Sequence, residues 1–176
     1  SFNNYRKLSD DVIEVWSKIL IGSNSQIILK DPFKESEDIK KNIFTKFINK
    51  GVKENQLIFL GFEKKDEDHY KHYNKINLAL DTFPYPGVTT TFESILMGVP
   101  VLTMKGFNFV SRGGSSINKN IGMPDLIASN YAEYISIANK LINDHELHIK
   151  NGNKLREKAI SSPLCDPVTF PKDFEN

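Results

Sequence analysis

The chain has 176 residues, of which 39% are hydrophobic and 26% are charged, and its formal net charge is +1. These values are typical of one globular domain, and a chain of this length can bury a substantial core. They give no support to a nucleic-acid-binding surface, so any anion site must be a local feature. The only cysteine, Cys165, excludes an internal disulfide and fits a reducing, cytoplasmic setting. No apolar run approaches the roughly 20 residues of a membrane span.

The first third of the chain predicts two helix–strand units. After Ser9, a reasonable N-cap, residues 9–21 carry apolar side chains at helical spacing, and residues 26–29 form a short apolar run. Residues 36–50 are again amphipathic, and residues 56–60 form the next apolar run. This part of the chain therefore predicts helix, strand, helix and strand in turn.

The same alternation continues to the end of the chain. Residues 67–75 predict a helix, 76–80 a strand, 89–97 a helix and 99–103 a strand. The remaining segments predict a helix at 111–120, a short strand at 123–127, and closing helices at 131–143 and 145–160. We expect one domain over residues 1–161 and a proline-containing tail over 162–176.

Short, continuously apolar strands that alternate with helices predict an α/β fold. Its Rossmann-like parallel sheet has helices on both faces. In such sheets, ligands bind at the carboxyl ends of the strands. The loop 82–88 follows a predicted strand, so we expect it to lie at that edge.

The segment 80–103 is the most informative part of the sequence, because it predicts a phosphate site. A strand is followed by the turn Pro84-Tyr-Pro-Gly87 and by a helix that opens on Thr89, Thr90 and Thr91. Helix N-termini attract anions, threonine hydroxyls are donors, and Gly87 allows close approach of the backbone. The threonines can instead simply cap the helix.

Glu93 lies one turn inside this helix and has two interpretations. Its carboxylate can accept hydrogen bonds from sugar hydroxyls, or it can interact only with the helix dipole. A nucleotide diphosphate would need both phosphate and sugar contacts. The segment therefore favours a ligand of that class.

Four ordered motifs resemble the O-GlcNAc transferase and Spindly family of protein glycosyltransferases. The longest is Asp81-Thr-Phe-Pro-Tyr-Pro-Gly-Val-Thr-Thr-Thr-Phe-Glu-Ser with Met97-Gly-Val-Pro-Val-Leu-Thr. The others are Phe2-Asn-Asn-Tyr-Arg-Lys7, Val110-Ser-Arg-Gly-Gly-Ser-Ser and Ile160-Ser-Ser-Pro-Leu164. The resemblance covers nearly the whole chain.

The resemblance implies a GT-B fold, in which two Rossmann-like domains face each other across a cleft. This chain is similar to the C-terminal, donor-binding domain. The family has a buried strand immediately before the position of Ser1, so we expect the first strand to be missing. We also expect the acceptor domain and tetratricopeptide helices to lie outside this sequence, and the isolated fragment to be inactive.

The family's functional positions match single residues of this sequence. Lys7 matches the lysine that contacts the donor phosphates and assists departure of the nucleotide, and Thr89 and Thr90 match the phosphate-binding threonines. Glu93 matches an acidic residue on the ribose. The remaining matched or neighbouring candidates for donor binding are Asn4, His69 beside the base, Gly87, Thr91 and Arg112. Arg112 can grip a phosphate or make a structural salt bridge.

We expect no metal and no cofactor other than the nucleotide-sugar donor. His69 and His72, three apart on a predicted helix, have no evident third ligand. Two departures concern base recognition. Val88 replaces a histidine found in some relatives, and residues 63–66 replace a proline-containing segment, so uracil and guanine both stay open.

The sequence therefore predicts the donor-binding domain of an inverting, metal-independent protein glycosyltransferase. The donor is UDP-GlcNAc or UDP-glucose, and the protein acceptor, a Ser/Thr hydroxyl or an Asn amide, is reached through the N-terminal half. The alternative is a non-catalytic nucleotide-sugar-binding or interaction module. A dinucleotide-dependent oxidoreductase is disfavoured, since no GxGxxG motif follows a predicted strand.

Overall fold

The computed structural model describes residues 1–30, 37–143 and 145–167. The strands in this part are β1 (Ile27–Lys30), β2 (Leu57–Leu60), β3 (Ala79–Leu80), β4 (Val101–Met104) and β5 (Ile127–Ala128). The helices are α1 (Asp10–Ile21), α2 (Glu37–Asn49), α3 (Asp66–Lys71), α4 (Thr89–Leu96), α5 (Gly113–Asn120), α6 (Tyr131–Asn143) and α7 (His145–Ile160). Within the described ranges, none of the helices is long and apolar enough to cross a membrane.

Each predicted strand and helix has a counterpart in this order, but several are shorter than predicted. The strand predicted at 76–80 is reduced to Ala79–Leu80. The Pro100 carbonyl accepts from the Ala79 amide (2.9 Å), but proline has no N–H to extend the ladder towards residue 77. Pro124 begins a 3₁₀ turn, which confines β5 to two residues. The predicted start of α2 at residue 36 and the tail beyond Pro167 lie outside the described residues.

All strand pairs are parallel, as predicted. β1 pairs with β2, and separately β3, β4 and β5 pair in that order. Consecutive residues of one strand point to opposite faces of the sheet. Leu80 and Leu102 therefore belong to one core cluster, and Ala79 and Val101 to the other.

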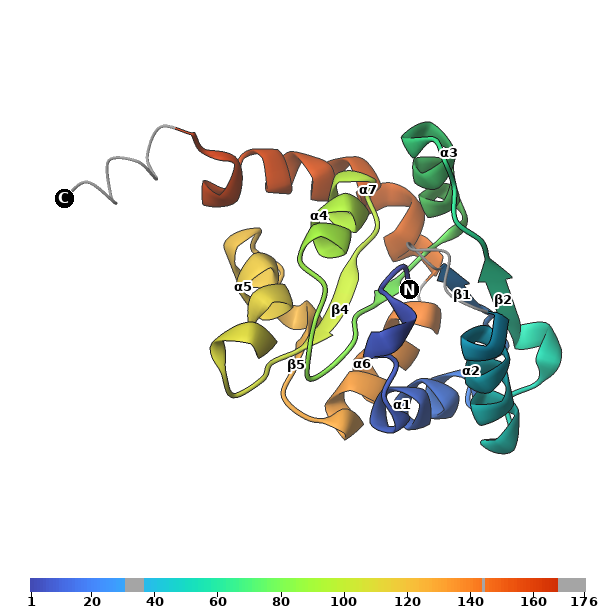
Figure 1. Cartoon of the computed structure of the whole chain (residues 1–176). Helices are drawn as coiled ribbons and strands as arrows, with labels where there is room; N and C mark the ends of the chain where they lie inside the picture. Colours follow the sequence, from blue (N-terminus) through green and yellow to red (C-terminus); the bar gives the residue numbers. More distant parts are fainter. Residues whose placement is uncertain (31–36, 144, 168–176) are drawn as a thin grey trace.

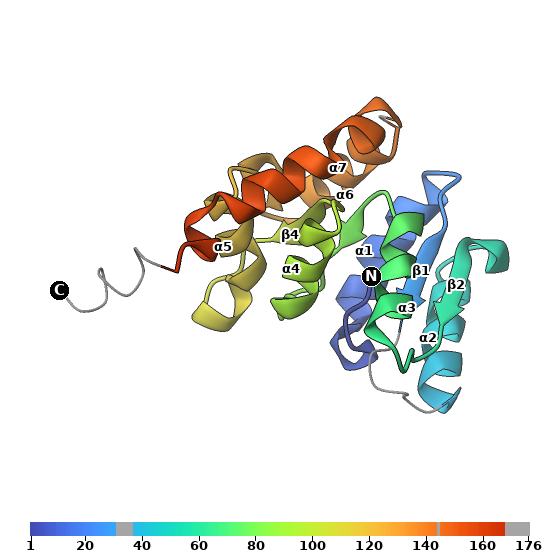
Figure 2. The same ribbon diagram turned by 90° about the horizontal axis from the view of Figure 1, so that it is seen from above.

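Helices cover both faces of the sheet, as predicted. The first core cluster combines strand residues with α1, α2 and α6, and the second combines them with α4, α5 and α7. Figure 1 shows the two groups of helices on opposite sides of β4, and Figure 2 shows the same elements from above. Trp16 and Phe47 are completely buried in the first cluster, and Ile95 and Leu155 are buried in the second. This layering leaves the strand ends as the place for a ligand.

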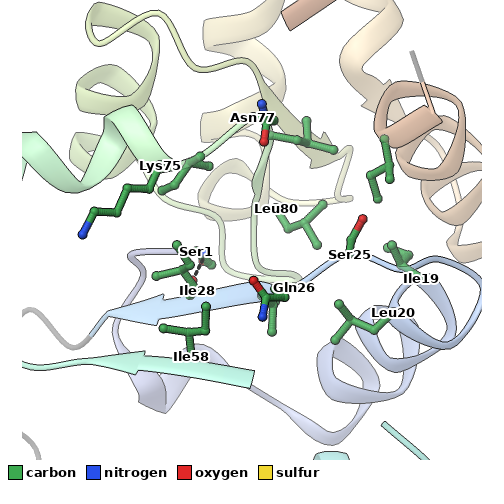
Figure 3. Close-up of a pocket in the computed structure, with 14 residues that line it drawn as sticks. Ser1, Ile19, Leu20, Ser25, Gln26, Ile28, Ile58, Lys75, Asn77 and Leu80 are labelled. Atoms are coloured by element: carbon green, nitrogen blue, oxygen red, sulfur yellow. Dashed lines mark hydrogen bonds between the residues drawn. The ribbon is translucent and has the colours of Figure 1, made fainter. Parts of the chain in front are cut away.

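A cavity of about 270 Å³ separates the two strand groups. Its walls include Ile28 from β1 and Leu80 from β3, as Figure 3 shows. At its edge Ser1 donates to the Ile28 carbonyl (2.6 Å), and its own carbonyl accepts from the amide of Lys30 (3.1 Å). Residue 1 thus continues the hydrogen bonding of β1 on the side away from β2. The strand expected before Ser1 lies outside this sequence and stays a prediction.

Candidate functional site

The predicted phosphate site lies where β3 ends and α4 begins. β3 stops at Leu80, the chain turns through residues 81–88, and α4 starts at Thr89. Val88 occupies the N-cap position and makes no side-chain capping bond, and the Thr91 hydroxyl instead donates to the Gly87 carbonyl (3.0 Å). The threonines therefore do not act as the N-cap of α4. The cavity between the strand groups is lined by none of the residues predicted for the site.

Lys7 lies beside this loop although 79 residues separate it from Pro86. Its ammonium donates to the Pro86 carbonyl (3.0 Å) and to Oδ1 of Asn3 (3.3 Å), and it lies 4.6 Å from the centre of the Tyr85 ring. Burial lowers the pKa of Lys7, and the nearby Asp81 carboxyl opposes that shift. A half-buried ammonium at a helix N-terminus is suited to hold an anion.

The three threonines differ in their surroundings. Thr89 is exposed and Thr90 is half-buried, with its hydroxyl donating to Oδ1 of Asn3 (3.2 Å). Thr91 is buried, and its hydroxyl is engaged within the loop. The geometry thus makes Thr89 and Thr90 accessible at the start of α4 and turns Thr91 inward. The donor-binding role predicted for each stays a prediction.

Gly87 stands where the loop passes closest to the threonine side chains. A Cβ atom there would lie 2.9 Å from Oδ1 of Asn3 and still closer to the Thr90 hydroxyl. Contacts so short do not occur for real Cβ atoms, so a larger residue at this position would displace the Asn3 and Thr90 side chains. The close approach of the backbone to a ligand at residue 87 stays a prediction.

His69 and Glu93 meet across 24 residues of sequence at one end of the site. Nε2 of His69 lies 3.4 Å from Oε2 of Glu93, and the Tyr73 hydroxyl donates to the same oxygen (3.2 Å). The His69 ring packs near the rings of Phe2 (5.7 Å) and Tyr73 (5.6 Å). Glu93 therefore does more than face the helix dipole. A carboxylate beside a half-buried aromatic cluster can receive a sugar hydroxyl next to a stacked base.

Two predicted residues have local partners in this structure. Asn4 accepts a hydrogen bond from the amide of Arg6 (2.8 Å) and so caps the turn that carries Lys7. Arg112 donates to the carbonyls of Phe107 (2.6 Å) and Gly106 (3.4 Å) in the loop after β4. Arg112 is therefore a structural brace of that loop through carbonyl groups. Its predicted contact with a phosphate stays a prediction.

The two histidines considered as a metal pair contact different carboxylates. His69 lies on Glu93, and Nε2 of His72 lies 3.0 Å from Oε1 of Glu63. Among the residues that the structure describes, no group of three or more metal-ligating side chains of the His, Cys, Asp and Glu types is present. The polar groups gathered at the site are the Lys7 ammonium, the hydroxyls of Thr89 and Thr90, and the N-terminus of α4.

Three contributors to this site were not singled out from the sequence. Asn3, Asp81 and Tyr73 each contact residues that were predicted. Asp81 had a usable signal, since it is a carboxylate that directly follows a buried strand and precedes the glycine turn. Asn3 lies next to the predicted Asn4, so only the backbone conformation decides which of the two turns inward.

The sequence profile of glycosyl transferase family 41 matches residues 1–174. The chain belongs to this family. The probable UDP-N-acetylglucosamine–peptide N-acetylglucosaminyltransferase SPINDLY of Eustoma exaltatum subsp. russellianum is 36% identical over 99% of our chain. The UDP-N-acetylglucosamine–peptide N-acetylglucosaminyltransferase of Caenorhabditis elegans is 28% identical over the full chain. The resemblance inferred from the four motifs is confirmed.

Solved structures give the same answer for the fold. The O-GlcNAc transferase of Thermobaculum terrenum, solved as its K341M mutant, matches 99% of our chain with a TM-score of 0.90 and 29% identity. The Anabaena HepE protein in complex with UDP matches with a TM-score of 0.66 at 18% identity, which supports the fold alone. The Rossmann-like domain of a GT-B glycosyltransferase is thereby confirmed. Our family 41 chain spans 19% of the Eustoma relative and 34% of the Thermobaculum chain.

Proposed function

We propose that this chain is the donor-binding domain of an inverting, metal-independent protein glycosyltransferase that uses UDP-GlcNAc or UDP-glucose. Lys7, Thr89, Thr90 and the N-terminus of α4 hold the diphosphate. Glu93 receives the ribose, and His69 lies beside the base. The acceptor, a Ser/Thr hydroxyl or an Asn amide of a protein, is reached through a part of the parent protein outside this sequence.

The proposal depends on one observation above the others, the place of Lys7. Residues 7 and 86 are brought together so that the ammonium lies against the loop that leads into α4. The Thr90 hydroxyl shares an acceptor with it, since both donate to Oδ1 of Asn3. A cation and hydroxyl donors at a helix N-terminus, with a carboxylate further along the same helix, are the contacts that a nucleotide diphosphate needs.

The same groups favour the transition state of glycosyl transfer. As the bond from the sugar to the diphosphate breaks, negative charge builds on the leaving phosphate oxygens. A fixed ammonium and the partial positive charge of α4 interact more strongly with that developing charge than with the intact donor. These residues of the chain therefore supply the leaving-group stabilisation that a divalent cation supplies in other glycosyltransferases.

Calorimetric titration of this chain with UDP, GDP and NAD, with and without magnesium, tests the binding part of the proposal. We expect UDP binding that is independent of magnesium and is weakened in Thr90→Ala. The matched control is Thr45→Ala, an exposed helical threonine whose hydroxyl donates to the Lys41 carbonyl of its own helix (2.9 Å). A preference for GDP would contradict the choice of uracil as the base. Binding of NAD alone would contradict the whole proposal.

Turnover by the full-length parent tests the role of Lys7. We expect Lys7→Ala to lower kcat by about 10²- to 10³-fold, the range found when one donor to a developing oxyanion is removed. Lys105→Ala is the control, because Lys105 is an exposed lysine that directly follows β4, at the same edge of the sheet. Turnover of Lys7→Ala close to that of the control would exclude the catalytic role and favour a non-catalytic binding module.

A further inference from the structure

A buried polar cluster lies beneath Lys7 and the first turn of α4. Asp81 is 1% exposed, and Asn3 and Thr103 are also buried. One carboxylate oxygen of Asp81 accepts from Nδ2 of Asn3 (3.2 Å), the Thr82 amide (3.0 Å) and the Gly87 amide (2.7 Å). The other accepts from the Thr103 hydroxyl (2.8 Å). Three separate segments of the chain thus meet at one carboxyl group.

We propose that Asp81 and Asn3 are positioning residues of the donor site: Asp81 fixes the direction of the Asn3 amide, and Asn3 fixes where the Lys7 ammonium meets the Thr90 hydroxyl. The inference rests on the proposed function and deepens it. It names two residues that act through Lys7 without touching the donor.

The direction of the Asn3 amide follows from hydrogen-bond chemistry. A carboxylate only accepts, so the group of Asn3 that faces Asp81 must be its NH₂, which donates. The amide oxygen then points the opposite way, where it accepts from both Lys7 and Thr90. In the reversed amide, the Asn3 oxygen would face the Asp81 carboxylate oxygen. The Asn3 NH₂ would face the Lys7 ammonium and the Thr90 hydroxyl, which are donors themselves. Asp81 therefore sets the direction of the acceptor that Lys7 and Thr90 share.

Asn3 and the Pro86 carbonyl hold the Lys7 ammonium and leave one of its N–H donors available. An ammonium has three N–H donors, and Asn3 and the Pro86 carbonyl accept from two of them. The third can therefore bond to a phosphate oxygen. Because the lysine is held before the donor arrives, less side-chain entropy is lost on binding. The arrangement is preorganised for an anion.

The charge of Asp81 acts in the same direction as its hydrogen bonds. Burial lowers the pKa of Lys7, and Asp81 opposes this by favouring the charged ammonium. The other titratable group that faces Asp81 is Tyr134 on α6, whose hydroxyl donates to the Asp81 carbonyl (2.9 Å) and whose pKa is raised by burial. Removing the carboxylate charge should therefore make Lys7 easier to deprotonate.

A direct catalytic role for Asp81 does not fit its surroundings. The carboxylate is closed off by four donors and by α5, since a Cβ atom at Gly114 would lie 2.6 Å from its Oδ2. A group so enclosed cannot reach an acceptor hydroxyl. A purely structural role, as a brace of the loop, would affect stability but would not involve the ionisation of Lys7. The two roles are therefore separable by experiment.

The test follows the Lys7 side chain by NMR during a pH titration of the ligand-free chain. Asp81→Asn is the main variant, because asparagine keeps an acceptor for the Gly87 amide and can donate to Thr103, so that mainly the charge is lost. Asn3→Ala removes the shared acceptor. The matched control is Asn118→Ala, a buried asparagine that bonds to the carbonyls of Val101 (2.8 Å) and Leu126 (3.2 Å) away from Lys7.

We expect the titration midpoint of Lys7 to shift downward in Asp81→Asn and in Asn3→Ala, and to stay unchanged in Asn118→Ala. An unchanged midpoint in both site variants would overturn the inference. If Asp81→Asn does not fold, as judged by loss of the dispersed amide spectrum, Asn3→Ala decides alone.

Calorimetry with UDP separates this inference from the proposed function. We expect about tenfold weaker UDP binding by Asn3→Ala, the usual effect of losing one hydrogen bond to a charged group. If the wild-type chain does not bind UDP but the two site variants still show the Lys7 shift, only the proposed function would be contradicted. Normal UDP binding to both site variants with no Lys7 shift would contradict the positioning inference alone.

Discussion

Two loops at the same edge of the sheet are built in opposite ways. The loop after β3, residues 81–88, buries Asp81, Thr82 and Phe83, and the side chains of Asp81 and Thr82 hold its backbone by hydrogen bonds. The loop after β4, residues 105–112, is braced by Arg112 but leaves Phe107 and Phe109 100% and 91% exposed.

Exposure alone does not locate the site. The β4 loop exposes apolar rings, and the Arg112 guanidinium donates to carbonyl groups of the loop itself. In the β3 loop the buried carboxylate organises donors that converge near the start of α4. Phosphate recognition needs fixed hydrogen-bond donors, so the proposed function has the sugar nucleotide bind at the β3 loop.

The largest expected effect concerns the pH dependence of stability. Burial raises the pKa of Asp81 to about 6, despite its hydrogen bonds and Lys7, which pull the pKa down. The folded chain therefore holds this proton more tightly than the unfolded chain, where an aspartate titrates near 3.8. Asp81 therefore adds on the order of 3 kcal/mol to the unfolding free energy below about pH 4. This contribution is lost as the pH rises through about 6.

Denaturant unfolding of the wild type and Asp81→Asn between pH 4 and 6.5 measures this effect. The exposed ion pairs of Asp10 and Glu14 have carboxyl groups with lowered pKa values and titrate with the opposite sign, but they are present in both proteins. The difference between the two unfolding free energies therefore isolates Asp81. A difference that stays constant with pH would show that the carboxyl is not held in a raised-pKa state.

The second prediction adds one methyl group to the β3 loop. Gly87→Ala should weaken UDP binding by about 10- to 100-fold, because the new Cβ would displace Asn3 and Thr90 at the usual free-energy cost of overpacking. Gly61→Ala, in the loop after β2, is the control, since a Cβ there meets nothing within 4 Å. Calorimetry on both variants provides the measurement. Equal affinities would show that the close approach at residue 87 is not needed for the donor.

The elements were predictable from the sequence, whereas the polar cluster was not. Apolar runs and helical spacing identify the strands and helices because burial depends on local pattern. Asn3, Asp81 and Thr103 come together only after β3 pairs with β4 and the N-terminal turn packs beside them. No local pattern encodes contacts at separations of 22 and 78 residues.

The family motifs identified residues at the surface of the site but did not predict which buried residue holds them together. Lys7 and Thr90 were predicted separately, and the structure shows that one oxygen of Asn3 links them. Thr91 was grouped with its neighbours, yet its hydroxyl turns inward, because position 91 of α4 faces the core. A motif gives residue types in order, and side-chain direction depends on the helix that carries them.

The third prediction concerns the far end of the site. Glu93→Ala should weaken UDP binding by about tenfold through loss of a charged acceptor for the ribose. Tyr73→Phe removes only the hydroxyl that donates to Glu93 (3.2 Å) and should have a smaller effect, about threefold at most. Titration with UDP and with inorganic pyrophosphate, which lacks both the ribose and the base, separates ribose contacts from phosphate contacts. Equal losses for both ligands would place Glu93 at the phosphates instead.

The smallest expected effect is in the β4 loop. The double change Phe107→Ser and Phe109→Ser should alter neither the UDP affinity nor the unfolding free energy by more than about 0.5 kcal/mol, since both rings are in solvent. Phe83→Ser, which removes a buried ring of the β3 loop packed against Tyr134 (5.5 Å), is the matched comparison and should destabilise the chain by about 3 kcal/mol or more. A loss of UDP affinity in the double variant would show that the donor also rests on the β4 loop, and the contrast between the two loops would then fail.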